Sequence, residues 1–178
     1  MDHVGASCER FIIRNAAPEH AGPIAAIQVE ASRAAYSAAA PPGYFDGFTV
    51  PSRMSAWSQM IANQNDLQQI IVAEENNAIR GYAHFGRSRD PDAPPDVGEL
   101  YSLYVAPLHW RRGVGKRLLH ASLRGLAYMA FDTATLWVLT FNRPAGAFYE
   151  RLGWMPDGCE KTDQANLTEI RYRVSTRR

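Results

Sequence analysis

The sequence predicts an α/β protein whose mixed, mostly antiparallel sheet of about seven strands is flanked by about four helices. Segments with apolar residues at helical spacing alternate with short runs that are rich in β-branched and aromatic residues. Their order is strand, two helices, three strands, helix, strand, helix and two strands. Strands that follow one another directly can pair antiparallel, whereas strands separated by a helix can pair in parallel, so we expect a mixed sheet.

Length and composition favour one globular domain. The 178 residues suffice to bury a core, and the hydrophobic share is 46%. We expect the domain to occupy residues 10–175, after a flexible N-terminal extension over residues 1–9. The net charge of +1 creates no overall field that would attract nucleic acid.

The sequence contains no recognisable targeting pattern. No run approaches the ~20 apolar residues of a membrane span, and residues 1–10 lack the apolar core of a signal peptide. We therefore expect a cytoplasmic protein with no nucleic-acid partner and no membrane partner. Whether it forms a homodimer stays open.

The first part of the chain predicts one strand and two helices. Residues 11–14 form the strand, and residues 18–38 form a helix with an apolar stripe. The loop over residues 39–51 contains Pro-Pro-Gly and Asp-Gly turns beside three aromatic residues. Ser52 is expected to cap the second helix.

The remaining elements follow from changes in period. A hairpin of strands over residues 69–74 and 79–87 turns at Asn76-Asn77. Later elements are a strand over 99–105, a helix over 114–129, a strand over 135–140, a helix over 143–152, and strands over 154–160 and 167–174.

The junction between the fourth strand and the third helix is the most informative stretch. Pro107 stops the strand, and a glycine-broken, basic turn opens the helix. Gly113 and Gly115 let a ligand approach the main chain closely, and the first helical turn leaves about four N–H groups unpaired. With the helix dipole and the neighbouring cations, this turn is suited to a phosphate or pyrophosphate.

Two motifs resemble those of the GNAT family of N-acetyltransferases. Residues 110–115 resemble its acyl-coenzyme A motif, Gln/Arg-x-x-Gly-x-Gly/Ala, with Trp110 in place of Gln or Arg. Residues 142–154 resemble its later motif, Asn-x-x-Ala-x-x-Phe-Tyr-x-x-x-Gly-Phe/Trp, at every fixed position. The element order is also similar, so the resemblance covers about residues 11–174.

The resemblance implies transfer of an acetyl group from acetyl-CoA to a primary amine of a small molecule or peptide, by direct attack in a ternary complex and without a metal. It implies that strand-four main chain pairs with the pantetheine, that the glycine turn holds the pyrophosphate, and that Asn142 contacts the coenzyme; Asn142 also suits a plain helix N-cap. The residues expected to bind the coenzyme are Leu103, Tyr104, Val105, Arg111, Arg112, Gly113, Val114, Gly115, Lys116 and Asn142.

Two residues are expected to be catalytic. Tyr149 matches the family tyrosine beside the coenzyme sulfur, where a protonated phenol can donate to the departing thiolate; a core aromatic is the alternative interpretation. The attacking amine must be neutral, so a base helps. Glu99 stands at the offset from Trp110 at which histone-modifying members carry a basic glutamate, with His84 and His109 as rivals.

The acceptor site is the least defined part of the hypothesis. Tyr36, Tyr44 and His84 are candidates for binding the acceptor, with Phe45, Asp46 and Trp57 as further wall residues that packing explains equally well. The alternative function is a non-catalytic acyl-CoA-binding sensor or interaction module with the same fold.

Overall fold

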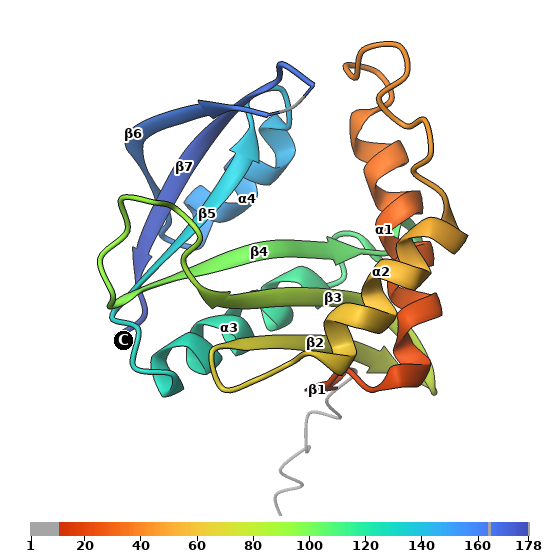
Figure 1. Ribbon diagram of the computed structural model, residues 1–178, viewed down its shortest axis with the longest axis horizontal. Helices are drawn as coiled ribbons and strands as arrows, with labels where there is room; N and C mark the ends of the chain where they lie inside the picture. The colour runs from red at the N-terminus through yellow and green to blue at the C-terminus, as the bar shows by residue number, and fades with distance from the viewer. Residues whose placement is uncertain (1–10, 164, 178) are drawn as a thin grey trace, which may run out of the picture.

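The computed structural model describes residues 11–163 and 165–177, so the extension expected over residues 1–9 lies outside the described part. The elements, arranged as in Figure 1, are β1 (Ile12–Asn15), η1 (Pro18–His20), α1 (Ala21–Tyr36), α2 (Val50–Ala62), β2 (Gln68–Glu75), β3 (Ala78–Arg87), β4 (Val97–Val105), η2 (Pro107–His109), α3 (Val114–Tyr128), β5 (Thr133–Leu139), α4 (Arg143–Arg151), β6 (Met155–Thr162) and β7 (Thr168–Ser175). The predicted element order is confirmed.

The sheet has the order β1-β2-β3-β4-β5-β7-β6 and is antiparallel except between β4 and β5. The parallel pairing of β4 with β5 is short and runs only from Val97, opposite Thr133, to Glu99, opposite Thr135. Beyond these residues the two strands diverge, as Figure 1 shows. Within the described part of the chain, the edge of β4 from residue 100 to residue 105 therefore has no strand beside it on the β5 side.

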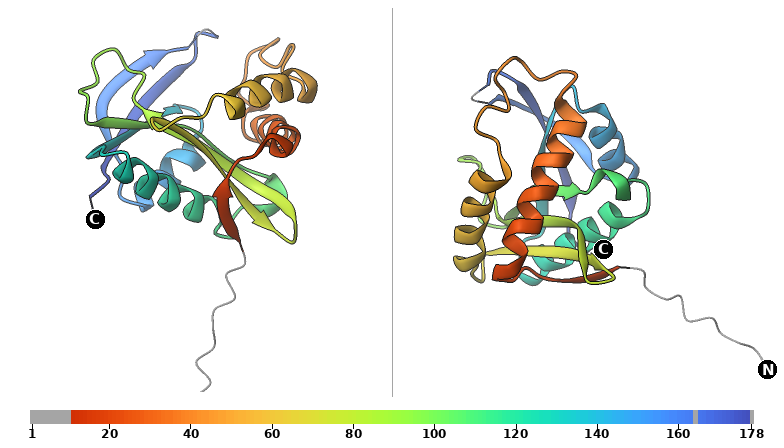
Figure 2. Two further views of the ribbon diagram at one scale, coloured as in Figure 1. Left: turned by 60° about the horizontal axis from the view of Figure 1, so that its bottom comes forward. Right: turned by 90° about the vertical axis from the view of Figure 1, so that its right-hand side faces the viewer.

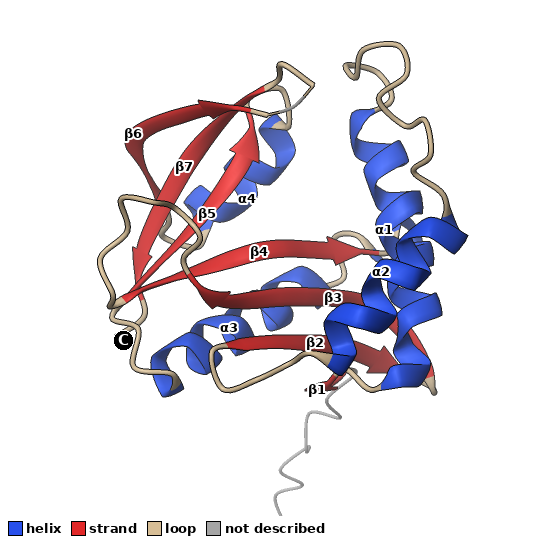
Figure 3. Ribbon diagram, in the orientation of Figure 1, coloured by secondary structure: helices blue, strands red, loops and turns tan. Residues whose placement is uncertain are grey.

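Helices cover both faces of the sheet. α1 and α2 lie on one face and α3 and α4 on the other, as Figures 2 and 3 show. Trp57 and Tyr82 belong to the core under α1 and α2, while Phe85 and Leu118 belong to the core under α3 and α4. The apolar stripe predicted for α3 is confirmed, since Val114, Leu118, Leu119 and Leu126 are each at most 1% exposed. Burial of such side chains, at about 1.5–3 kcal/mol each, holds the helices against the sheet.

The first two helices begin at residues other than those expected. α1 begins at Ala21, after the short 3-10 turn η1, so Pro23 lies in its first turn, where its missing N–H needs no partner. α2 is capped by Thr49, whose Oγ1 accepts a hydrogen bond from the Ser52 N–H at 3.4 Å. Ser52 is the third helical residue, and the prediction that it is the cap was wrong. Pro51 fits the first turn of this helix, which moves its start upstream.

The remaining boundaries lie within two residues of those expected. Asn76 and Asn77 have φ values of 51° and 57°, which suits the tight turn expected between β2 and β3. β4 begins two residues earlier than expected, at Val97, because its start pairs with β5. Among the described residues, the helices are too short or too polar for a membrane span.

Candidate active site

The N-terminus of α3 presents main-chain N–H groups to open space. Gly113 precedes the helix with a φ of 87°, and among the described residues no side chain caps this end. Arg111 has a left-handed φ of 60°, so the chain turns sharply into the helix. A Cβ placed on Gly113 would meet no atom within 4 Å. Because Arg111, Arg112 and Lys116 are exposed at this turn, it has the charge and the open main chain to hold a pyrophosphate.

Gly115 lies where α3, β4 and α4 meet. A Cβ at this position would lie 3.4 Å from Phe148 Cζ, 3.7 Å from Val105 Cγ2 and 3.8 Å from Leu103 Cδ2. These are ordinary van der Waals distances, so the space beside Gly115 accepts a methyl group but little more. The side chain of Val114 is 1% exposed in the core, so this residue has only its main chain to offer a ligand.

The free edge of β4 offers the main chain of Leu103 and Val105. The Ala106 N–H donates to the Arg80 carbonyl of the neighbouring strand at 2.9 Å. In an antiparallel pair the residues alternate between facing the partner strand and facing away from it. The main chain of Tyr104, opposite Tyr82, therefore faces β3, while Leu103 and Val105 face the opening. The expectation that the Tyr104 main chain pairs with the coenzyme is corrected: only its side chain is available.

Asn142 caps the N-terminus of α4. Its Oδ1 accepts a hydrogen bond from the Ala145 N–H at 3.4 Å, and Pro144 occupies the first turn of the helix. The capping role considered for Asn142 is thus confirmed. The cap also fixes the side chain at the end of β5, where Asn142 is partly exposed.

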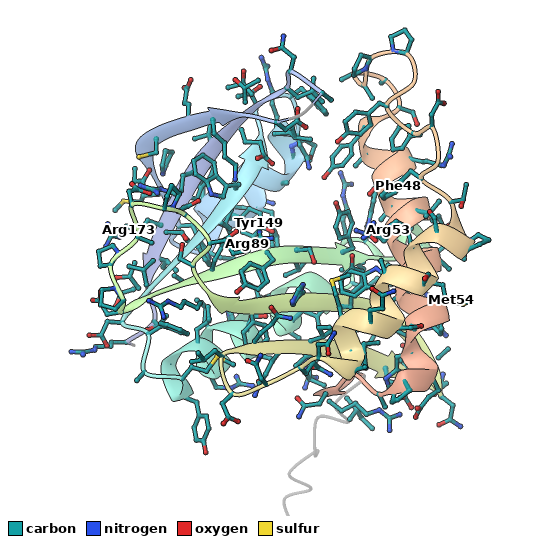
Figure 4. All side chains as sticks on the ribbon, in the orientation of Figure 1. Phe48, Arg53, Met54, Arg89, Tyr149 and Arg173 are labelled. Carbon is teal, nitrogen blue, oxygen red and sulfur yellow. The ribbon has the colours of Figure 1, made fainter. Side chains whose placement is uncertain are left out.

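Tyr149 of α4 is 8% exposed, and Figure 4 labels it near the place where β4 and β5 diverge. Its ring makes edge contacts with Phe148 and Trp154, with centroid distances of 5.1 Å and 5.9 Å. Burial raises the pKa of the Tyr149 hydroxyl, and Tyr104 raises it further. The phenol therefore keeps its proton at neutral pH and can act as a proton donor.

Tyr36 reaches the same place from the end of α1. Burial raises the pKa of its hydroxyl, followed by the effect of Tyr104, with smaller effects from Tyr149 and Tyr44. The structure thus brings Tyr36 and Tyr149 together around Tyr104, although they come from helices on opposite faces of the sheet. Tyr44 lies in the loop between α1 and α2, and its pKa is raised by burial and then by Asp163.

Glu99 is 2% exposed, and Arg89 donates hydrogen bonds to both oxygens of its carboxylate. The Arg89 main-chain N–H donates to Oε2 at 2.8 Å, and its guanidinium donates to Oε1 at 2.6 Å. The guanidinium also lies over the ring of Tyr101, 4.1 Å from the centroid. Glu99 is therefore held as a paired carboxylate at the fork of the sheet, where β4 and β5 begin to diverge.

His84 lies on β3 with an imidazole nitrogen that lacks a partner. Its Nε2 is buried, and no described residue forms a hydrogen bond with it. The ring packs against Tyr101 and Trp57, with centroid distances of 4.7 Å and 5.7 Å. Burial lowers the pKa of His84 to about 4, with the charge of Arg89 as the second cause, so the ring is neutral at neutral pH.

Two other expectations about side chains change in the structure. The Nδ1 of His109 lies 3.8 Å from the Glu75 carboxylate on the β2–β3 hairpin, apart from the group around Glu99. Trp57, considered as a wall of the acceptor site, is a core residue that is 2% exposed, and its N–H donates to Gln28 Oε1.

Sequence reasoning missed Arg89 and Tyr101. Arg89 donates a hydrogen bond to Glu99, and its guanidinium lies over the ring of Tyr101. The Tyr101 hydroxyl donates to the Arg87 carbonyl at 2.5 Å. Arg89 belongs to no motif and lies in a loop, so its pairing depends on how that loop folds back over β4. The only sequence signal was that Glu99 and Tyr101 are two residues apart, a spacing that places both side chains on the same face of a strand. The irregular register between β3 and β4 obscures this relation.

Comparison with known proteins gives a family and a fold. Residues 33–154 match the acetyltransferase (GNAT) family. The uncharacterised N-acetyltransferase YuaI of Bacillus subtilis is 28% identical over 139 residues, which cover 78% of this chain and 76% of YuaI. Mycothiol acetyltransferase of Streptomyces coelicolor is 31% identical over 106 residues, but these cover only 30% of that protein and 60% of this chain.

Solved structures share the fold over nearly the whole chain. Ribosomal-protein-alanine N-acetyltransferase of Brucella melitensis superposes with a TM-score of 0.74 at 21% identity, covering 92% of this chain and 99% of the other. PaiA N-acetyltransferase of Thermoplasma acidophilum, in complex with coenzyme A, gives a TM-score of 0.71 at 15% identity, with coverages of 93% and 98%. Together with the match over residues 33–154, these findings establish that the chain belongs to the GNAT family of acetyltransferases.

Proposed function

We propose that this protein transfers the acetyl group of acetyl-CoA to a primary amine of a small molecule or peptide, by direct attack in a ternary complex in the cytoplasm. The observation that carries the proposal is the free edge of β4, which lies between the uncapped N-terminus of α3 and the protonated phenol of Tyr149. A structural neighbour in complex with coenzyme A supports the choice of coenzyme.

The residues around α3 fit the coenzyme. The space in front of Gly113 and the exposed cations at Arg111, Arg112 and Lys116 suit the pyrophosphate. Leu103 and Val105 can pair with the amide groups of the pantetheine as an added strand would. When bound, acetyl-CoA supplies an acetyl group that is activated as a thioester. Asn142 would contact the pantetheine arm of the coenzyme from the α4 side.

Tyr149 acts as the proton donor in this proposal. Burial and the neighbouring Tyr104 hold its pKa above the ordinary value, so the phenol is protonated when the amine attacks. Its O–H can then donate to the sulfur as negative charge develops on the departing thiolate. Donation from a fixed phenol removes the need to draw a proton from bulk water at this step.

Glu99 is the proposed base that accepts the proton of the amine. Its burial and its fixed carboxylate support this role, while the three hydrogen bonds from Arg89 occupy part of its acceptor capacity. His84 is the rival, since its neutral ring offers an unpaired nitrogen on the same face. Tyr36 and Tyr44 would form the wall on the acceptor side. The relatives above are named for quite different acceptors, and we assign none of those acceptors to this protein.

Binding and turnover can be tested with a matched pair of variants at Gly115. We expect calorimetry to detect acetyl-CoA binding by the wild type and by Gly115→Ala, because a methyl group fits the observed distances. Gly115→Asp should lose binding, because its carboxylate would repel the pyrophosphate. Thiol release should then follow the addition of an amine from a broad panel.

Two results would contradict the proposal. Wild-type protein that binds no acetyl-CoA would remove the coenzyme site. Binding without thiol release across the whole panel, unaffected by Tyr149→Phe, would instead favour the non-catalytic acyl-CoA-binding module.

A further inference from the structure

We propose that Trp110 is a positioning residue for the coenzyme: its indole N–H fixes the Val105 carbonyl that ends the free edge of β4. This inference rests on the proposed function, because it concerns the edge at which the pantetheine would pair. It assigns a role to the residue at which this chain departs from the family motif. The role follows from one hydrogen bond and from the turn that this bond closes.

The bond is short and has one possible direction. Trp110 Nε1 donates to the Val105 carbonyl at 2.7 Å. An indole is a donor only, so its N–H must find an acceptor or remain unpaired. Trp110 is 44% exposed, so packing constrains it less than it constrains a buried aromatic residue. An aromatic residue so exposed contributes little to the core, so its hydrogen bond is the main constraint on its position.

The turn that the bond closes joins the two halves of the coenzyme site. Between Val105 and Trp110 the chain makes the short turn η2, in which the His109 N–H donates to the Ala106 carbonyl at 2.8 Å and the Trp110 N–H to the Pro107 carbonyl at 3.1 Å. Immediately afterwards come the left-handed residues Arg111 and Gly113 that lead into α3. The indole therefore ties the end of β4 to the segment that carries the pyrophosphate turn.

Val105 is the position where such a tie affects the ligand. The next residue, Ala106, turns its N–H toward β3, so Val105 is the last residue of β4 that faces the opening. A carbonyl oxygen has two lone pairs, so the indole can hold it while a ligand amide uses the second. A carbonyl fixed in advance costs the ligand less ordering on binding.

The departure from the family motif then has a simple chemical meaning. Glutamine and arginine, which the motif carries at this position, share with tryptophan one property: an N–H donor at the end of a long side chain. Charge and aromaticity are not shared. The donor is therefore the property that the proposed role requires at this position.

Two variants separate the donor from the ring. Trp110→Phe keeps an aromatic ring of similar shape and removes the N–H, whereas Trp110→Gln removes the ring and keeps a donor. We expect Trp110→Phe to raise the Kd for coenzyme A and the KM for acetyl-CoA by about threefold to tenfold, the usual range for one hydrogen bond. Trp110→Gln should restore both constants toward wild-type values. The KM for acetyl-CoA should rise while the KM for the amine stays unchanged. A general loss of folding would not change one KM and leave the other as it is.

Tryptophan fluorescence gives a readout that is independent of turnover. Of the four tryptophans, Trp57 and Trp154 are at most 2% exposed, so quenching by acrylamide should report mainly Trp110, with a part from Trp137. Adding coenzyme A should protect the Trp110 emission in the wild type, and Trp110→Gln should bind coenzyme A without this change.

The outcomes distinguish the two proposals. No binding by wild-type protein would overturn the proposed function. If the wild type binds coenzyme A and Trp110→Phe binds it equally well, only the role of the indole N–H is overturned. The same holds if Trp110→Gln weakens binding more than Trp110→Phe does.

Discussion

Replacing His84 with phenylalanine should remove a large part of the acid sensitivity of the fold. The imidazole is 8% exposed and lies between Trp57 and Tyr101, with ring centroids 5.7 Å and 4.7 Å away. A phenyl ring can keep these contacts, and it has no nitrogen to leave unpaired. Burial is the first cause that lowers the pKa of His84 from 6.5 to about 4, and the charge of Arg89 is the second.

The sign and size of the effect follow from these two pKa values. The unfolded chain protonates His84 near pH 6.5, whereas the folded protein does so only near pH 4. The stability that depends on the neutral ring is therefore complete above pH 6.5 and is lost as the pH falls to about 4. At 1.36 kcal/mol per pKa unit, the loss amounts to about 3 kcal/mol of unfolding free energy.

Denaturant unfolding at a series of pH values measures this loss. Between about pH 7 and pH 4, the unfolding free energy of the wild type should fall by about 3 kcal/mol more than that of His84→Phe. Tyr128 is 91% exposed at the end of α3, so Tyr128→Phe should keep the wild-type pH dependence and serves as the control. Parallel curves for wild type and His84→Phe would refute the assignment of a depressed pKa to a buried, neutral imidazole.

Three further substitutions test the site and its support. Tyr149→Phe should lower kcat by about 10²-fold and leave the Kd for coenzyme A nearly unchanged in calorimetry, because only the proton donor is lost; an equal loss in both constants would point to a packing role. Glu99→Gln should lower kcat in thiol-release assays and leave the Kd for coenzyme A nearly unchanged, and an unchanged kcat would move the role of base to His84 or to water. Arg171→Gln should lower the unfolding free energy by about 1–3 kcal/mol in denaturant titrations, since it leaves the half-buried carboxylates of Asp90 and Asp157 without their partner; no measurable loss would show that water replaces the guanidinium.

The motifs with local chemistry could be predicted from the sequence. Gly113 and Asn142 each start a helix, and a helix start depends on a few neighbouring residues, so the position of both in the structure agrees with the prediction. The order of strands and helices could also be predicted, because period and turn residues are local properties. The misplaced cap of α2 marks the limit of this reasoning: both Ser52 and Thr49 suit a cap, and Pro51 decides between them.

Features that depend on contacts distant in the sequence could not be predicted. Arg89 pairs with Glu99 only because the β3–β4 loop folds back over the strand that follows it. The contribution of Tyr104 was misjudged for a similar reason. Which main-chain groups face the opening depends on the register with β3, and the irregularity at His84 changes that register. A pattern of residue types contains no information about register on its own.

Beyond the fork between β4 and β5, side-chain hydrogen bonds connect the two halves of the sheet. The main-chain pairing of these strands ends at Glu99, so it cannot set their separation farther along. Arg171 of β7 supplies a second connection, since it donates to Asp157 of β6 at 2.8 Å and to Asp90 of the β3–β4 loop at 3.0 Å. Trp137 of β5 donates to the same Asp90 carboxylate at 3.0 Å. Because Asp90 directly follows the arginine that grips Glu99, the side chains that join the two halves of the sheet also position the proposed base.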